Sequence, residues 1–244
     1  MSRFFGFLLS PLHHLAFFII LIVFQPIQWL SLKIGGYKAH KTSVDWLNFF
    51  LTSAYYILGN TVKFVNHHNL PTNRPIIFAA NHQSMYDIPP LIWFLRKYHA
   101  KFISKIELTK NIPSISFNLK YGGGANIDRK DKKQSLGEIM KLGERMQKNI
   151  WSAVIFPEGT RSKNGVMKEF QIGGISVLLK KAPDALIVPI AIENSWKVVK
   201  NGSVWLHAFI PLKFTVLQPI EPAGKDVLAL IKQAETEVRE FIEK

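Results

Sequence analysis

A charge-free stretch near the N-terminus constrains this chain more than any other feature of its sequence. Residues 4–32 contain no Asp, Glu, Lys or Arg, and they include the unbroken apolar run LAFFIILIVF from Leu15 to Phe24. A helix that spans a bilayer needs about 20 predominantly apolar residues, whereas Pro11 and Pro26 bracket this run and proline disturbs a helix interior. We therefore expect a membrane-seeking segment but not a simple straight span.

Residues 42–59 have the pattern of an amphipathic helix. Trp46 and Phe50 recur at helical spacing on an apolar side, while Asn48 and Thr52 occupy the other side. A helix of this kind lies along a membrane surface. We expect it to follow the apolar helix directly.

The joint KIGGYKAHK separates the two expected helices, and its basic residues would lie among lipid headgroups. We predict that residues 1–59 form a two-helix hairpin that lies in or dips into one leaflet as a monotopic anchor, and that residues 60–244 form an α/β body. A cleaved signal peptide fits less well, because its charged start would be Arg3 alone and no small-x-small cleavage site follows the apolar run.

The chain is strongly basic, with 31 Lys and Arg against 17 Asp and Glu and a formal net charge of +14. Such a surface attracts anions, and nucleic acid, acidic lipid headgroups and phosphorylated substrates all qualify. No nucleic-acid-binding motif is present, and nucleic acid would not explain the apolar N-terminus. The absence of cysteine excludes disulfides and thiolate chemistry, and the adjacent histidine pairs, without any HExxH sequence, argue against a metal site.

From residue 61 onward, short β-type runs alternate with longer helical ones. This alternation predicts an α/β fold, with a mixed, mostly parallel sheet covered by helices. The expected strands are 61–65, 76–80, 101–104, 125–128, 152–156 and 186–192, with a longer β-rich tract at 203–217 that Pro211 interrupts. The expected helices are 88–99, 131–149, 174–182 and 225–244.

The sequence NHQSMYD follows the apolar run at 76–80, where a buried strand is expected to end. His82 and Asp87 are five residues apart, which is wrong for one helix face and indicates a bend. Asp87 can accept the ring N–H of His82 and leave the other ring nitrogen basic. Alternatively, Asp87 is simply the N-cap of the following helix, whose first turn holds prolines; the two roles are compatible.

A second stretch, IFPEGTRS at 155–162, also follows an apolar strand. Gly159 frees the backbone, Thr160 offers a hydroxyl and Arg161 a planar fork suited to phosphate, so the stretch resembles an anion cradle. An ordinary strand-to-loop turn with a solvated arginine is the alternative. Glu158 would repel an anion unless it is paired, so we expect it to hold Arg161 or a bound acceptor.

A third stretch, YGGGANIDRK at 121–130, carries three glycines that allow the main chain to approach a ligand, or simply form a turn before an edge strand. Arg129 follows it as a second possible phosphate contact, and Lys105 is another cation at a strand end. No GxGxxG or Walker sequence is present, so nucleotide binding is poorly supported.

In this order, NHQSMYD, GGGANIDR, FPEGTRS and IVPIAI resemble the four ordered blocks of the glycerolipid acyltransferase superfamily, above all bacterial 1-acylglycerol-3-phosphate acyltransferases. The resemblance implies a general base, its orienting carboxylate and an acceptor-binding loop. The matching positions are His82 as base, Asp87 as its orienter, Glu158 and Arg161 as acceptor-binding residues, Gly159 and Thr160 as shapers of their loop, Arg129 and Lys105 as basic positions, and Pro189 as the proline of the fourth block.

The resemblance implies transfer of a fatty acyl group from acyl carrier protein or coenzyme A to the free hydroxyl of 1-acylglycerol-3-phosphate, giving phosphatidic acid. It implies no cofactor and a location on the cytoplasmic face of the inner membrane. Because the acceptor hydroxyl is itself the nucleophile, a base and its orienter suffice and no catalytic serine is required.

Two positions depart from the family pattern. Gln171 stands where a cation is usual, and Asn126 where an apolar residue is usual. Another lysolipid, a lysophospholipid or lyso-aminolipid, therefore stays open as acceptor. Two further alternatives are a lipid ester or thioester hydrolase, in which His82 activates water, and a non-catalytic protein that binds anionic lipid.

Overall fold

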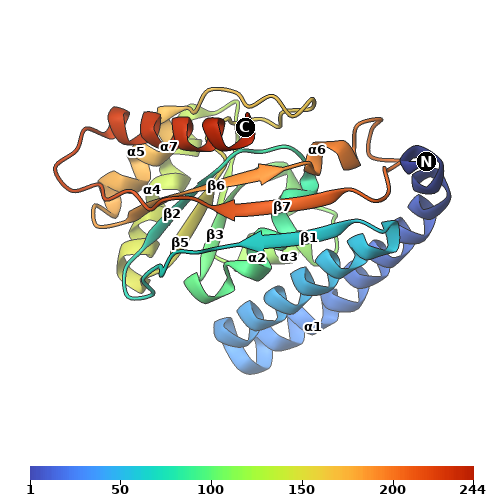
Figure 1. Cartoon of the computed structure of the whole chain (residues 1–244). Helices are drawn as coiled ribbons and strands as arrows, with labels where there is room; N and C mark the ends of the chain where they lie inside the picture. Colours follow the sequence, from blue (N-terminus) through green and yellow to red (C-terminus); the bar gives the residue numbers. More distant parts are fainter.

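A seven-stranded sheet forms the centre of the chain in this computed structural model, which describes residues 1–244 (Figure 1). The strand order is β1-β7-β6-β2-β5-β3-β4. Strands β2 to β6 run parallel, β7 is antiparallel to β6, and β1 is parallel to β7, so the expected mixed, mostly parallel sheet is confirmed. The strands are β1 Thr61–Val65, β2 Ile76–Ala80, β3 Ala100–Lys105, β4 Ala125–Ile127, β5 Ser152–Ile155, β6 Leu186–Glu193 and β7 Pro211–Val216.

The central strand β2 shows why the sheet is covered on both faces. Its five residues are all fully buried, as expected for a parallel strand that reads as a continuous apolar run. Side chains alternate along a strand, so Ile77 and Ala79 join one core cluster while Ile76, Phe78 and Ala80 join the other.

Helices pack on each face of the sheet. The cluster on one face is completed by α4 (Lys132–Asn149), α5 (Ile172–Lys181) and α7 (Val227–Ile242), and the cluster on the other by α2 (Ile88–Phe94) with the short turn η1 (Ala54–Leu58). The remaining short elements are η2 Met85–Asp87, η3 Arg96–Tyr98, η4 Ile106–Thr109, α3 Ile115–Tyr121 and α6 Ser195–Val198.

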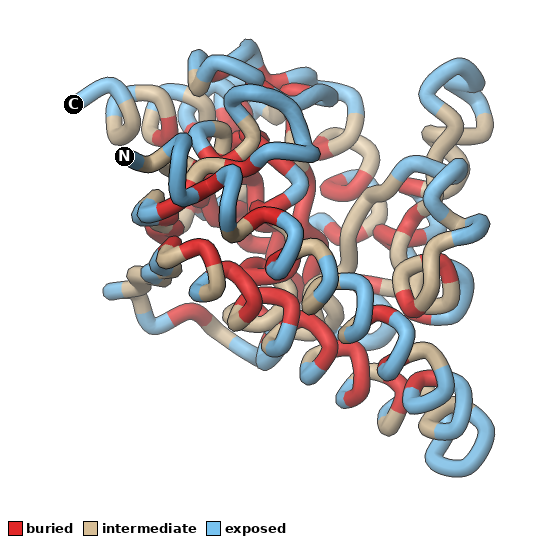
Figure 2. Tube along the Cα trace, turned by 90° about the vertical axis from the view of Figure 1, so that its right-hand side faces the viewer, coloured by how far each residue is buried: buried red, intermediate tan, exposed pale blue.

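The N-terminal element α1 (Ser2–Ser53) is helical throughout except at Gly36, where φ is 66° and ψ is −162°. The chain folds back at this residue, because the rings of Phe24 and Phe50 lie 5.7 Å apart and His40 Nε2 is 3.3 Å from Gln28 Oε1. The two arms therefore lie side by side (Figure 1), and the turn between them is exposed (Figure 2).

The position of this turn agrees with the glycine-containing joint in the sequence. The prolines do not end the helix, since Pro11 and Pro26 both lie inside the first arm. By length and composition, the segment Ser2–Leu58 is apolar enough to cross a membrane, with a mean hydropathy of 2.3 over its best window and 22% of that window buried.

In the second arm, large apolar side chains face outward, as expected of a helix that lies along a membrane, and polar side chains face the body. Trp46 and Phe50 are 48% and 44% exposed, whereas Asn48 and Thr52 are buried against the body. Both polar side chains donate to main-chain carbonyls four residues earlier in the same helix, Asn48 Nδ2 to Val44 O and Thr52 Oγ1 to Asn48 O. Their polar atoms are thus satisfied within the helix, and burial does not leave them without partners.

The expected β-rich tract at 203–217 is wrong in its first half. Only Pro211–Val216 forms a strand, and proline is tolerated at the first residue of a strand. Residues 203–210 are irregular because their main-chain groups bond to α1 and neighbouring turns instead of a strand: Leu206 N donates to Ser10 Oγ, and Ala208 N to Ser2 O.

Candidate active site

The carboxyl ends of five neighbouring parallel strands meet at one edge of the sheet, which is where open α/β sheets bind ligands. Taken in strand order, each of these ends carries a candidate residue. They are Ser195 after β6, His82 and Asp87 after β2, Glu158 to Arg161 after β5, Lys105 at the end of β3, and Arg129 after β4.

His82 and Asp87 lie in direct contact at this edge. His82 Nδ1 is 2.8 Å from Asp87 Oδ2, His82 is 7% exposed and Asp87 is fully buried. A carboxylate only accepts hydrogen bonds, so Nδ1 carries the hydrogen in this contact and the lone pair of a neutral ring is on Nε2. Nε2 has no hydrogen-bond partner within the chain.

The Asp87 carboxylate is held by the turn that contains it. Oδ2 also accepts from the main-chain N–H groups of Gln83 at 2.7 Å and Ser84 at 2.9 Å, and Oδ1 accepts from the Ser195 hydroxyl. Asp87 closes a capping box with Ser84 at the start of η2, and its side chain makes no cap bond to α2. Asp87 does occupy the N-cap position of α2, but its side chain does not cap that helix, because its oxygens bond to His82, to the preceding turn and to Ser195.

The His82 ring is further restrained by Phe156, the residue after β5. The two rings are stacked, with centroids 4.0 Å apart and an interplanar angle of 15°. His82 O also accepts from Ser162 N at 2.8 Å. Ring orientation is thus set by Asp87 on one side and by an aromatic face on the other.

Glu158 connects the loop after β5 to the loop after β2. Its Oε1 accepts from His82 N at 2.6 Å and its Oε2 from Lys168 N at 2.9 Å. Burial raises the pKa of Glu158, and these two hydrogen bonds act against that rise. Of the two expected partners of Glu158, Arg161 is wrong, because the carboxylate bonds to main-chain N–H groups and forms no ion pair with Arg161.

Three cations lie exposed at the same edge: Arg161, Arg129 and Lys105. Partial burial and the nearby charge of Arg161 lower the pKa of Arg129, and Glu107 opposes them. Arg129 and Arg161 are therefore neighbours with no carboxylate bridging them. This is a suitable arrangement for an anion such as a phosphate.

Lys168 adds a fourth cation that the sequence patterns did not single out. Its Nζ donates to Thr160 Oγ1 at 2.6 Å and to Arg161 O at 3.3 Å. Gly159 has φ of 70°, so it takes the left-handed conformation that allows this loop to turn. Gln171 is exposed at the N-terminus of α5, and its main-chain N–H donates to Pro157 O.

The glycines at 122–124 form the turn before β4, which is an edge strand. A Cβ at Gly124 would lie 2.7 Å from Phe102 O, so glycine is required there by close packing on β3. Asn126 binds within the same region, where its Nδ2 donates to Leu119 O at 2.6 Å. Of the two interpretations of the glycine run, the structure therefore agrees with a turn before an edge strand.

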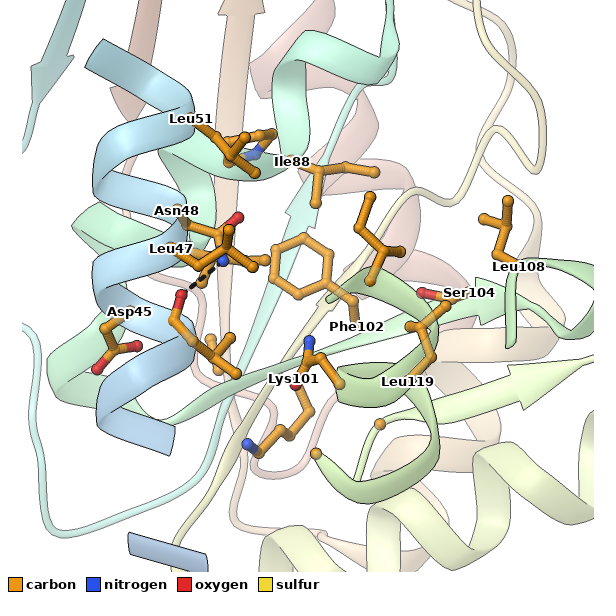
Figure 3. Close-up of a pocket in the computed structure, with 18 of the residues that line it drawn as sticks. Asp45, Leu47, Asn48, Leu51, Ile88, Lys101, Phe102, Ser104, Leu108 and Leu119 are labelled. Carbon is orange, nitrogen blue, oxygen red and sulfur yellow. Dashed lines mark hydrogen bonds between the residues drawn. The ribbon is translucent and has the colours of Figure 1, made fainter. Parts of the chain in front are cut away.

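A largely apolar pocket of about 430 Å³ lies between α1, α2, β3 and α3 (Figure 3). Arg161 and Met85, from the loops after β5 and β2, line one end, and Ser104 of β3 lines its wall. Lys101 also lines the pocket, and it lies three residues before Ser104 in β3, which is about 10 Å along the strand. The pocket therefore extends from the active-site edge toward the amino end of β3.

Lys101 is the unusual polar group of this pocket. Its ammonium lies 5.2 Å from the Tyr37 ring centroid and 4.9 Å from that of Trp151. Burial, with a smaller effect of the Lys41 charge, lowers the pKa of Lys101 to about 7. The end of the pocket away from Arg161 thus contains a lysine whose charged form is destabilised by burial.

Several residues of the site were missed in the sequence. Ser195 lies three residues beyond the IVPIAI block, Phe156 is the first letter of the FPEGTRS block, to which no role was given, and Lys168 lies six residues after that block. Proximity to a recognised block was the only available signal for each. The structure contains no group of three or more His, Asp or Glu side chains arranged to hold a metal ion.

Comparison with known proteins agrees with this geometry. The sequence profile of the family described as Acyltransferase matches residues 61–193, more than half of the chain. The chloroplast 1-acyl-sn-glycerol-3-phosphate acyltransferase of Arabidopsis thaliana is 30% identical over 161 residues, which are 66% of this chain and 44% of that protein. The human 1-acyl-sn-glycerol-3-phosphate acyltransferase beta is 27% identical over 203 residues, 82% of this chain and 70% of that protein.

This chain spans less than half the length of the relatives from Arabidopsis thaliana and Brassica napus that it matches. Among solved structures, the 1-acyl-sn-glycerophosphate acyltransferase of Thermotoga maritima superposes with a TM-score of 0.82 at 22% identity, over 100% of this chain and 97% of that one. The fold is therefore shared along the whole chain, α1 included. Because the family profile spans the loops that bring His82, Asp87, Glu158 and Arg161 together, the chain belongs to the acyltransferase family.

Proposed function

We propose that this chain is a 1-acylglycerol-3-phosphate acyltransferase, which moves a fatty acyl group from a thioester to the free hydroxyl of the lysolipid and forms phosphatidic acid. The observation that carries the proposal is the contact of 2.8 Å between His82 Nδ1 and Asp87 Oδ2, with Nε2 left unpaired, in a loop whose Met85 lines a largely apolar pocket. The names of the relatives from Arabidopsis and human support the choice of acceptor.

His82 acts as general base in this proposal. Its Nε2 takes the proton of the acceptor hydroxyl as that oxygen forms a bond to the thioester carbonyl carbon. Asp87 keeps Nδ1 as the donor and stabilises the imidazolium that results. The tetrahedral intermediate then breaks its carbon–sulfur bond, and the leaving thiolate takes the proton back from Nε2. The base is regenerated without any covalent acyl-enzyme.

The acceptor phosphate is assigned to the cations at the sheet edge. Arg161 and Arg129 supply planar, always charged donors, and Lys105 and Lys168 add point charges. Glu158 serves the acceptor indirectly, because it joins the main chain at His82 to the main chain at Lys168 and so fixes the spacing between the base and this cationic loop. Lys168 compensates for the missing cation at Gln171.

The apolar pocket is assigned to the acyl chain. Its volume of about 430 Å³ is within the roughly 300–1,000 Å³ of typical small-molecule sites, and most of its lining residues come from α1, α2 and α3. The donor is a soluble thioester of acyl carrier protein or coenzyme A. No cofactor enters the proposed reaction.

Residues 1–59 are assigned to membrane attachment on the cytoplasmic face of the inner membrane, with residues 60–244 as the catalytic domain. Large apolar side chains remain exposed along the first arm of α1, among them Leu15 and Phe18 at 56% and 53%. Both arms lie along one side of the body (Figure 1), which supports a hairpin held within one leaflet rather than a spanning helix.

The test is to offer purified enzyme a panel of lysolipids with both thioester donors and to identify products by mass. We expect phosphatidic acid from 1-acylglycerol-3-phosphate and a loss of about 10²–10⁴-fold in kcat for His82→Ala, the usual contribution of a general base. His67→Ala, at an exposed histidine, is the matched control. Release of free fatty acid without acylated lysolipid would instead identify a hydrolase, and equal rates for His82→Ala and the parent would overturn the assignment of the base.

A further inference from the structure

The irregular segment before β7 forms an apolar surface together with the first turns of α1. Val204, Trp205 and Phe209 are 63%, 44% and 54% exposed. The Trp205 ring lies 4.4 Å from that of Phe7, and the Phe209 ring 5.5 Å from that of Phe5. We call residues 204–209 the α6–β7 loop; Figure 1 shows this part of the chain, in orange, reaching the N-terminus of α1.

The α6–β7 loop is fastened to α1 by a stripe of residues spaced four apart. Ser2 Oγ donates to Ala208 O at 2.6 Å, and Ser10 Oγ accepts from Leu206 N at 2.9 Å. Between them, a Cβ at Gly6 would lie 2.0 Å from Leu206 O, so only glycine permits this approach. Leu206 and Ala208 are buried by the contact.

Further main-chain groups of the loop find partners outside it. His14 Nε2 donates to Val204 O at 2.9 Å, His207 N donates to Val198 O, and Phe209 N donates to Leu58 O. A segment whose main-chain polar groups are paired can enter an apolar medium without leaving hydrogen bonds unmade. The main-chain N–H groups of Leu206 to Phe209 and the carbonyls of Val204 and Ala208 are thus paired, which lowers the cost of bringing this loop into an apolar medium.

Cations lie beside this surface, on segments of the chain that contain no carboxylates. Residues 1–44 and 194–210 contain no Asp or Glu. Lys197 and Lys200 both lie over the ring of Trp196, at 5.9 and 5.6 Å from its centroid. Arg3 and Lys200 are also close to His207, since their charges, after burial, lower its pKa. An apolar centre with a cationic rim matches the acyl region and anionic headgroups of a bilayer.

We propose that the α6–β7 loop is a second membrane-inserting element, which enters an anionic bilayer beside the N-terminal end of α1. The proposal rests on the membrane attachment assigned above to residues 1–59, and it extends that attachment to a segment of the catalytic domain far away in sequence. Val204, Trp205 and Phe209 enter the acyl region, and Lys197 and Lys200 remain among the headgroups.

The chain contains no cysteine, so a single introduced cysteine carries a nitroxide label at one known place. Three variants are compared: Val204→Cys in the loop, Ile19→Cys on the exposed side of α1, and Leu228→Cys, an exposed apolar position on α7. Each is bound to vesicles of mixed phosphatidylcholine and phosphatidylglycerol. Collision rates of the label with oxygen and with a water-soluble nickel chelate then report its depth.

We expect the labels at 204 and 19 to gain oxygen collisions and lose nickel collisions on binding, while the label at 228 stays aqueous. If the label at 19 inserts and the label at 204 stays aqueous, this proposal is overturned and the anchor stands. If both stay aqueous, the anchor fails as well. Spin–spin broadening at 204 would show a second copy of the chain on the surface instead of lipid, and it would also overturn the proposal.

Two double variants, one at the surface and one control, test the role of Lys197 and Lys200. Lys197→Gln with Lys200→Gln should weaken binding to phosphatidylglycerol vesicles by about fivefold for each lysine near the surface. Lys225→Gln with Lys232→Gln, two exposed lysines in and before α7, should leave it nearly unchanged. Equal losses in both double variants would overturn the assignment of Lys197 and Lys200 to the headgroup region.

Discussion

Ser195 donates its hydroxyl hydrogen to Oδ1 of Asp87, so the carboxylate that contacts His82 is also held by the first residue of α6, the helix that follows β6. Oδ2 of Asp87 is engaged by His82 and by two main-chain N–H groups of its own turn. Ser195 is therefore the long-range contact that sets the rotation of this carboxylate. It is a positioning residue for the His82–Asp87 pair.

Ser195→Ala should lower kcat about tenfold, because a buried acceptor left without its donor costs about 1–3 kcal/mol and the carboxylate gains freedom to turn. The KM for the lysolipid should change little. In a His82→Ala background the same substitution should have no further effect on rate, an outcome that a purely structural role would not produce. Ser176→Ala, whose hydroxyl bonds only to its own helix, is the control.

Glu158→Gln should reduce both activity and stability. A glutamine side chain has one acceptor oxygen, whereas Glu158 accepts from His82 N and Lys168 N with two. One buried N–H would then face an amide NH₂, and we expect a loss of about 1–3 kcal/mol in the free energy of unfolding. Thermal unfolding and steady-state kinetics measure the two effects. Glu169→Gln, at an exposed carboxylate nearby, should behave like the parent.

Val44→Trp should shorten the acyl chains that the enzyme accepts. Val44 lines the pocket next to Asp45 and Lys41, which lie with Lys101 toward the end away from Arg161. Overpacking costs about 1–3 kcal/mol, so kcat/KM for long-chain thioesters should fall about tenfold or more while that for short chains is kept. Leu228→Trp on α7 is the control. Equal losses at every chain length would contradict the assignment of the pocket.

Lys101→Met should stabilise the fold most at low pH. Burial lowers the pKa of Lys101 to about 7, so the folded state carries the full cost of the charge below about pH 7. That cost falls as pH rises from about 7 to the ordinary lysine value of about 10.5, above which both states are neutral. The gain in unfolding temperature should therefore be clear near pH 6 and small near pH 10.

Lys97→Met, at an exposed lysine over the Tyr98 ring, provides the matched control for this measurement. It should show little pH dependence in the difference from the parent. A gain for Lys101→Met that is constant across this range would contradict the lowered pKa and point to packing alone.

The positions of the strands were predictable because each is a short apolar run with a turn signal after it. The run at 76–80 and the bend that follows it already contain everything needed to bring His82 to Asp87, since the turn closes on itself through Ser84. A local hydrogen-bonded turn of this kind depends on few distant residues. The reversal of chain direction within α1 is also local, because it occurs at Gly36 in the glycine-containing joint of the sequence.

Other features could not be read from local pattern. Periodicity separates two faces of a helix but does not say what the polar face packs on, and here Asn48 and Thr52 are buried against the body while Trp46 and Phe50 are exposed. The tract at 203–210 has strand-forming residues, yet its main chain bonds to Ser2 and Ser10 of α1 instead of a neighbouring strand.

The sequence by itself therefore determined the family, the α/β alternation and the turn that joins His82 to Asp87, because each depends on residues that are close along the chain or on ordered motifs. Only the tertiary structure decided that Ser195 orients Asp87, that Glu158 binds main-chain N–H groups, and that the α6–β7 loop lies on α1. These contacts join segments about 70 to 200 positions apart, and their geometry follows from strand order and packing, which no local pattern encodes.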